Sequence, residues 1–237
     1  AGFEKKMFNN KNVYNYSMLI NSVQDIFNLV KDLKLRQGDT LLLGLDQSNF
    51  NKNYGTRLNN TYEKIFLKFP YLLFEKSKRY KNNYLIGYKS INNFSGFRND
   101  GSYYYGKRYI TPPEELEDYN FRNTTNKIKK GILRFQYGNE TDINQIKLIE
   151  QMLMFLKQKG VVVYGFFPPF APSISKIMMS SKYDYSYIDK SSKALENVFN
   201  NSDFYFKDFS YSNNFYDINF LDGVHFDENI NYEILKA

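Results

Sequence analysis

The chain has 237 residues, a length that suits one sizeable α/β domain. Its apolar fraction of 42% is enough for a hydrophobic core, so disorder is not expected. The lack of cysteine excludes disulfides, thiolate metal sites and cysteine nucleophiles, and no apolar run reaches the ~18–20 residues that span a bilayer.

The net charge of +7 is concentrated in the middle of the chain. Residues 51–136 contain 17 Lys and Arg against 7 Asp and Glu, so the remainder is slightly acidic. A basic region can face an anionic polymer, a membrane surface or nucleic acid, and it can equally be a solvated, lysine-rich surface. No RNP-like, helix-turn-helix or zinc phrase is present, so the charge does not favour a nucleic-acid partner.

The first predicted helix covers residues 18–33. Its apolar side chains recur every three or four residues and form one face: Leu19, Ile20, Val23, Ile26, Phe27, Val30 and Leu33. Ser17 stands ahead of them as an N-cap, whose hydroxyl can accept from a first-turn amide. The following segment, TLLLGLDQSNF at 40–50, has a short apolar run that predicts a strand buried on both faces, as in a parallel sheet.

Residues 51–140 are rich in Asn, Tyr and Lys and have weaker periodicity. We expect a long insertion with short helices, at TYEKIFLKF and PPEELEDYNFRN, that forms a cap over the strand ends. Within it, Tyr104 and Arg108 of DGSYYYGKRY would suit a sugar platform, with the tyrosine face against a pyranose ring and Arg108 on an acidic group. The alternative is a loop held by buried rings.

A second helix and strand follow the insertion. The segment INQIKLIEQMLMFLKQKG has one apolar stripe and a glycine stop, Gly160. The stripe consists of Ile146, Ile149, Met152, Leu153 and Leu156. The segment VVVYGFFPPFAP predicts another buried strand, a helix is expected near 190–199, and DFYFKDFS predicts a short edge strand. This alternation predicts right-handed βαβ units and a mostly parallel sheet, with ligands beyond the strands' carboxyl ends, where LDQSNF and FPPFAP lie.

The only histidine of the chain lies in FLDGVHFDE, residues 220–228. Asp222 precedes His225 by three residues, on a glycine-containing loop after the last predicted strand. A carboxylate so placed can accept from one ring nitrogen and fix the tautomer, while the other nitrogen faces a nucleophile. The alternative is an ordinary loop histidine that Asp222 caps. A single histidine without cysteine disfavours metal catalysis, and no glycine loop suits a phosphate, so neither metal nor cofactor is predicted.

These phrases together resemble the SGNH hydrolase superfamily, in particular its branch of bacterial exported proteins that handle acyl groups on surface polysaccharides. NFLDGVHF is similar to that branch's closing phrase F-x-D-G-x-H, and VYNYSMLINS, LLLGLDQSNF and VVVYGFFPPFAP resemble earlier phrases in the same order. The resemblance implies one α/β domain over residues 1–237, a flavodoxin-like three-layer sandwich with a mostly parallel sheet and a long insertion.

The resemblance also implies an activity: a serine esterase or O-acyltransferase that needs no cofactor. A serine would attack an acyl carbonyl, His225 would take its proton and Asp222 would orient the imidazole. The partner would be an acylated polysaccharide, including an anionic one, handled in the periplasm or at the cell surface, with room for a membrane tether ahead of residue 1. The lack of cysteine fits a cytoplasmic protein equally well. The alternative function is a non-catalytic protein of the same fold that binds or assembles polysaccharide.

The chain departs from the family at the nucleophile. The family's serine lies in a Gly-x-Ser phrase after the first strand, and AGFEKKMFNNKNVY has no serine. We therefore expect the first, central strand and its serine to precede Ala1, the closing helix to be only begun in ENINYEILKA, and the chain as given to be inactive.

The chain also departs from the family at the oxyanion hole. By position, the Ser17 segment corresponds to the family's glycine donor, and Gly44–Asp46 corresponds to its asparagine donor. Asp46 cannot donate when ionised. Asn15 or Asn49 could take its place. The alternatives are that Gly44 is a packing glycine and that Ser17 is only a helix cap.

Overall fold

The computed structural model of the protein describes residues 3, 5–8, 13–16, 22–54, 96–97, 102–104 and 118–237. The chain divides into two units, one formed by Ala1–Met18 and Thr56–Glu117 and the other by Leu19–Gly55 and Asp118–Ala237. Among the described residues, the first unit has a 3-10 helix and a two-stranded antiparallel sheet. These elements are Lys5–Phe8, β2 (Gly96–Phe97) and β3 (Tyr103–Tyr104).

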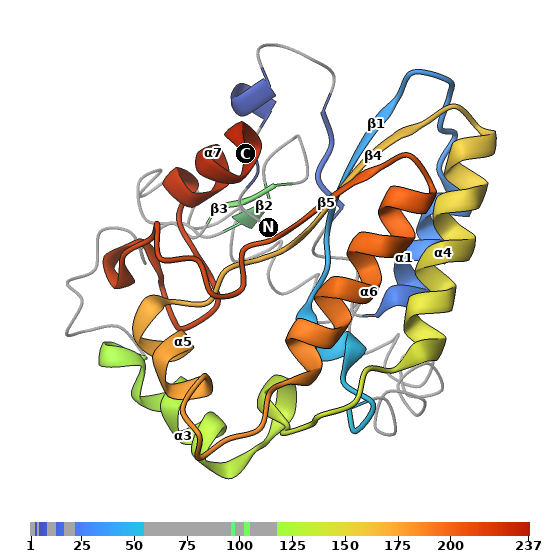
Figure 1. The fold of residues 1–237 in the computed structure, drawn as a ribbon. Coiled ribbons are helices and arrows are strands. Elements are labelled where there is room, and N and C mark those ends of the chain that lie inside the picture. The colour runs from blue at the N-terminus through green and yellow to red at the C-terminus, as the bar shows by residue number, and fades with distance from the viewer. Residues whose placement is uncertain are drawn as a thin grey trace, which may run out of the picture. The chain divides into compact units, whose positions relative to one another are not determined.

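The second unit contains a three-stranded parallel sheet (Figure 1). Its strands are β1 (Thr40–Gly44), β4 (Val162–Phe167) and β5 (Tyr205–Asp208), in the order β1-β4-β5. A parallel sheet with helices confirms the mixed α/β class. In the described sheet β4 lies between β1 and β5, and β1 pairs with β4 over five residue pairs, from Thr40 opposite Val162.

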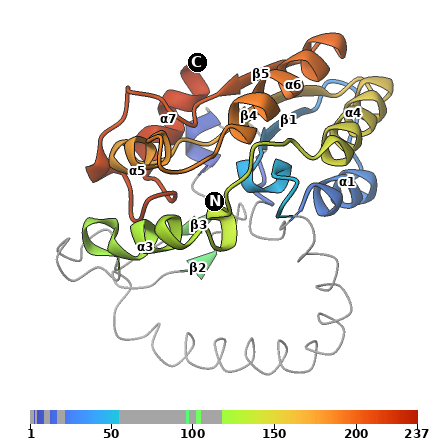
Figure 2. The ribbon, with the colours of Figure 1, turned by 60° about the horizontal axis from the view of Figure 1, so that its bottom comes forward.

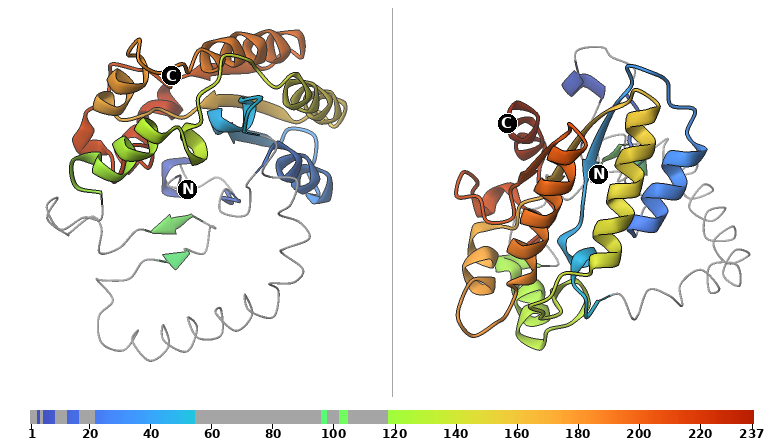
Figure 3. Two further views of the ribbon diagram at one scale, coloured as in Figure 1. Left: turned by 90° about the horizontal axis from the view of Figure 1, so that it is seen from below. Right: turned by 45° about the vertical axis from the view of Figure 1, so that its right-hand side comes forward.

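Three helices cover one face of this sheet, side by side (Figure 3). They are α1 (Val23–Asp32), α4 (Ile143–Gln158) and α6 (Tyr187–Asn201). The apolar stripe predicted for the second helix is confirmed, because all five of its members are buried in α4. Full burial of one such side chain contributes about 1.5–3 kcal/mol, so these stripes are the main attachment of the helices to the sheet.

The ends of α1 and α4 are fixed by side-chain caps. Ser22 Oγ accepts the N–H of Asp25 at 3.1 Å and begins α1. The cap is therefore Ser22 and not the predicted Ser17, which lies outside the described residues. Asp142 Oδ1 accepts the N–H of Asn144 at 2.9 Å and begins α4 in the same way.

The two faces of the sheet differ, which corrects the prediction of strands buried on both sides. On the helix face, Phe199 of α6 packs so closely on Gly165 that a Cβ there would lie 2.3 Å from the phenylalanine ring. On the opposite face, Val162, Tyr164 and Tyr205 are 41%, 47% and 46% exposed. The strands alternate because α1, α4 and α6 all lie on the same side.

The remaining helices of the second unit surround the carboxyl ends of the strands. They are α3 (Arg122–Lys130), α5 (Pro172–Met178) and α7 (Glu228–Lys236), and short 3-10 helices lie at Gln47–Phe50, Tyr119–Phe121, Leu133–Phe135 and Asp217–Asn219. Figure 2 shows α3 beside α5, and α7 lies across the sheet from α4 (Figure 1). α3 belongs to the stretch predicted as an insertion, most of which lies outside the described residues. Among the helices described, none combines the length and the apolar character needed to span a bilayer.

Candidate active site

The Asp222 carboxylate holds the His225 ring and its own loop at once. Asp222 Oδ2 lies 2.8 Å from His225 Nδ1, and Oδ1 accepts the backbone N–H groups of His225 at 2.7 Å and Val224 at 2.9 Å. An ionised carboxylate is only an acceptor, so the ring nitrogen facing it must be the donor. Nδ1 therefore bears a proton, and in the neutral ring Nε2 is the basic nitrogen.

The same contacts keep Asp222 ionised. Burial pushes the pKa of Asp222 upward, but the hydrogen bond and charge of His225, with the two backbone N–H groups, outweigh it and lower the pKa to about 2. Three donors to one carboxylate are the kind of environment that favours the charged form. The acid is thus an anion throughout the neutral range, and it can orient the imidazole.

Gly223 fixes the loop against its neighbours. Its carbonyl accepts the N–H of Ala171 at 3.1 Å, which joins the loop to the segment that follows β4. A Cβ at this position would lie 2.6 Å from Cγ2 of Thr124 and 2.8 Å from Cγ1 of Ile174, so α3 and α5 leave room only for glycine. The main chain then turns back, with the N–H of Leu221 donating to the carbonyl of His225 at 2.8 Å.

One side chain that was not singled out from the sequence joins the three strand ends. Gln47 follows β1 and is 3% exposed. Its Nε2 donates to the carbonyl of Pro168, after β4, at 2.6 Å, and to Oγ of Ser210, after β5, at 2.8 Å. Its position in the sequence could have identified it, because a polar residue shortly after a predicted strand lies at the edge where parallel strands end together.

Asp46 accepts hydrogen bonds and caps the short helix after β1. Its Oδ1 accepts the N–H and the Oγ–H of Ser48 at 2.9 and 2.7 Å, and Oδ2 lies 3.5 Å from the guanidinium of Arg134. Asn49 donates its backbone N–H to the carbonyl of Asp46. Burial and the nearby charge of Asp46 raise the pKa of Tyr187 well above its usual value, so that phenol is no base at neutral pH.

Gly44 lies opposite Phe166 in the sheet, and a Cβ on it would be 2.9 Å from the tip of the phenylalanine ring. This is the environment of a packing glycine, because the aromatic ring takes the space that a side chain would need. The contact with Phe166 therefore explains why position 44 is a glycine, without reference to a ligand.

The other residues considered from the sequence belong to the first unit or lie outside the described residues. Asn15 donates through Nδ2 to the carbonyl of Phe3 at 3.1 Å, and both belong to the first unit. Tyr104 lies on β3, also in the first unit. Ser17 and Arg108 lie outside the described residues. Within the second unit, Asp222 and His225 of the predicted set are in contact.

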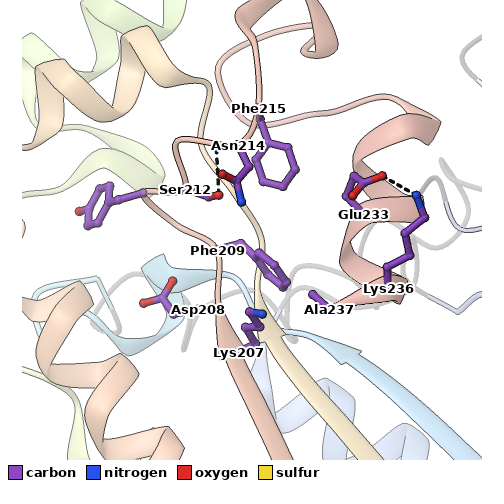
Figure 4. Close-up of a pocket in the computed structure, with 10 residues that line it drawn as sticks. Lys207, Asp208, Phe209, Ser212, Asn214, Phe215, Glu233, Lys236 and Ala237 are labelled. Atoms are coloured by element: carbon purple, nitrogen blue, oxygen red, sulfur yellow. Dashed lines mark hydrogen bonds and ion pairs between the residues drawn. The ribbon is translucent and has the colours of Figure 1, made fainter.

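A cavity of about 590 Å³ opens between α7 and the segment after β5 (Figure 4). Neither Asp222 nor His225 lines it. The His225 side chain is 46% exposed, so solvent reaches the imidazole outside this cavity. Within the described ranges, no group of three or more His, Asp or Glu side chains could hold a metal ion.

Comparison with family models, with curated proteins and with solved structures finds no match to this chain. The likeness of NFLDGVHF to an SGNH phrase therefore depends on the sequence alone. What the site can do follows from the geometry of Asp222 and His225.

Proposed function

We propose that Asp222 and His225 are the acid–base pair of an SGNH-type acyl-transfer site. The chain would then be an esterase or O-acyltransferase domain that acts on an acylated carbohydrate outside the bacterial membrane. The main support is the 2.8 Å contact between Asp222 Oδ2 and His225 Nδ1, on a carboxylate that stays ionised. It makes Nε2 the unprotonated nitrogen of the neutral ring, as a general base requires, on a side chain that is 46% exposed.

The proposed mechanism uses the two residues in sequence. A serine oxygen attacks the acyl carbonyl while His225 Nε2 takes the serine proton, and the ionised Asp222 stabilises the imidazolium that forms. Collapse of the tetrahedral intermediate breaks the ester C–O bond, and His225 returns the proton to the leaving alkoxide. Water or a second hydroxyl then repeats the steps in reverse to release or transfer the acyl group. The serine is the one that the family resemblance implies ahead of residue 1.

The fold and the charge support the same proposal. A parallel sheet with the dyad loop bonded to the segment after β4 fits a flavodoxin-like sandwich, in which ligands approach the carboxyl ends of the strands. The basic stretch over residues 51–136 suits an anionic polysaccharide. A periplasmic or cell-surface location, with a tether ahead of residue 1, belongs to this proposal.

A second candidate is a polysaccharide-binding protein without catalysis. Its support is that Asp222 Oδ1 accepts two backbone N–H groups of its own loop, as an Asp does in a purely structural turn. In that case His225 serves the turn, and no nucleophile is needed.

The deciding experiment is ester hydrolysis by the full-length gene product. p-Nitrophenyl acetate turnover is measured for the parent, for His225→Ala and for Asp203→Asn, an exposed acid paired with Lys157 on another part of the surface. Loss of the base lowers kcat/KM by at least about 100-fold, whereas Asp203→Asn retains the parent rate. Equal rates in His225→Ala and the parent would remove His225 from the mechanism. No turnover by any form, together with retention on a glycan column, would favour the binding protein.

A further inference from the structure

The cavity after β5 has the size and position of a small-molecule site. Its volume of about 590 Å³ falls within the range of roughly 300–1,000 Å³ that is usual for ligand pockets. It lies beyond the carboxyl end of β5, at the edge of the sheet where α/β proteins bind ligands. All of its lining residues belong to the second unit.

Two phenylalanines form an apolar floor. Phe209 and Phe215 are 7% and 6% exposed, and their ring centroids are 6.5 Å apart. Figure 4 shows both rings with the Asn214 side chain beside them. Asn214 is exposed, so its amide can both donate and accept at the rim. A flat ring with C–H groups on its face and hydroxyls at its edge fits this combination.

The two lysines that line the cavity differ in whether they already form an ion pair. The ammonium of Lys236 already pairs with Glu233 at 2.7 Å across one turn of α7. The ammonium of Lys207 lies 5.5 Å from the centroid of the Phe209 ring, and in the described part of the chain it forms no ion pair. The wall thus contains a neutralised pair and a second cation that can accept an anionic group.

Asp208 also lines the cavity, but its carboxylate is engaged elsewhere. Its Oδ1 accepts the backbone N–H of Ser210 at 2.7 Å. Figure 4 shows the Asp208 side chain directed away from that of Phe209, as expected for adjacent residues at a strand end. Lys207 therefore faces the α7 side of the cavity without Asp208 as a counter-ion.

We propose that this cavity binds one sugar unit that bears a carboxylate, that is, a uronate. The sugar face lies on Phe209, the carboxylate meets Lys207, and a ring hydroxyl bonds Asn214. This proposal extends the proposed function, because it makes an acidic glycan the class of substrate. It rests on the proposed function for the claim that the bound sugar is part of a polysaccharide substrate. Binding itself does not depend on His225, which does not line the cavity.

The test compares sodium glucuronate with glucose, two probes that differ by one carboxylate. Dissociation constants are measured by ligand-observed NMR for the parent, Lys207→Gln, Asn214→Ala and Lys147→Gln. Lys147 is an exposed lysine on α4, remote from the cavity lining, and serves as the matched control. The parent prefers glucuronate by about threefold to fivefold, Lys207→Gln removes the preference, and Lys147→Gln retains it. Asn214→Ala weakens the binding of both sugars.

Four results would overturn the proposal. Three are no binding of glucuronate, equal binding of the two sugars, and a preference that survives Lys207→Gln in a folded variant. The fourth is competition by inorganic phosphate as strong as that by glucuronate, which would show a plain anion site. His225→Ala binds glucuronate like the parent. Esterase activity tests the proposed function and glucuronate binding tests the cavity, so the failure of one can be told from the failure of the other.

Discussion

Asp222 does two things with one carboxylate: it closes the turn through Oδ1 and holds the imidazole through Oδ2. Both depend on its charge, because only the ionised form accepts from all three N–H groups at full strength. Gly223 contributes indirectly, through the position of the loop. Its contacts with Thr124 and Ile174 set the position of the turn that Asp222 closes. The reactive geometry is therefore a property of the loop and not of His225 alone.

The ionisation of Asp222 predicts a pH-dependent contribution to stability. Its pKa is about 2 in the folded chain and about 3.9 in an unfolded one, so folding favours the anion. The stabilisation, about 2 kcal/mol from a shift of this size, is full above roughly pH 5 and is lost as the pH falls toward 2. Urea unfolding should therefore show Asp222→Asn less stable than the parent at pH 7, with the gap closing near pH 2.

A gap of the same size at both pH values would contradict this account. It would mean that the substitution acts through shape rather than charge. Asp203→Asn is the control, because Asp203 is fully exposed and its pKa is lowered only by the surface partner Lys157. Solvent screens surface pairs of this kind, so they contribute little to stability.

At the scale of elements, the sequence predicted what depends on local periodicity. The stripe of α4 and the strands β1, β4 and β5 follow from spacing of apolar residues within one segment, and they are present. Burial of both sheet faces does not follow from such a pattern. Val162 and Tyr164 could have been buried by a helix, yet they are exposed because α1, α4 and α6 all lie on the other face of the sheet. Which face a helix takes depends on the connections between elements, and a single segment does not contain that information.

The beginning of α1 gives a prediction at this scale. Ser22 caps the helix by accepting the N–H of Asp25, so Ser22→Ala should lower the free energy of unfolding by about 1 kcal/mol. Thermal and urea unfolding of this variant and the parent measure the loss. A variant as stable as the parent would mean that the Ser22 hydroxyl contributes nothing to the beginning of α1.

At the scale of the whole molecule, the site depends on contacts between distant parts of the chain. The strands that meet at Gln47 come from three separate segments, and the dyad loop joins them through Ala171. The sequence predicted that LDQSNF and FPPFAP would lie at the same edge, because parallel strands end together. It could not identify Gln47 as the link, since its partners are 121 and 163 residues away. The contact between Asp222 and His225 was easier to predict from the sequence, because both residues lie on one turn.

The link between the strand ends should be strong enough to measure. Gln47→Met keeps the length of the side chain but removes the amide, which leaves the carbonyl of Pro168 and the fully buried hydroxyl of Ser210 without that donor. A buried group left unsatisfied costs about 1–3 kcal/mol, and only the Ser210 hydroxyl is fully buried, so the variant should lose about that much in urea unfolding. Gln24→Met on the exposed face of α1 is the control and should stay within about 0.5 kcal/mol of the parent. If Gln47→Met were as stable as the parent, the ends of the three strands would be held by packing of the sheet alone, and the dyad loop would not depend on this amide for its position.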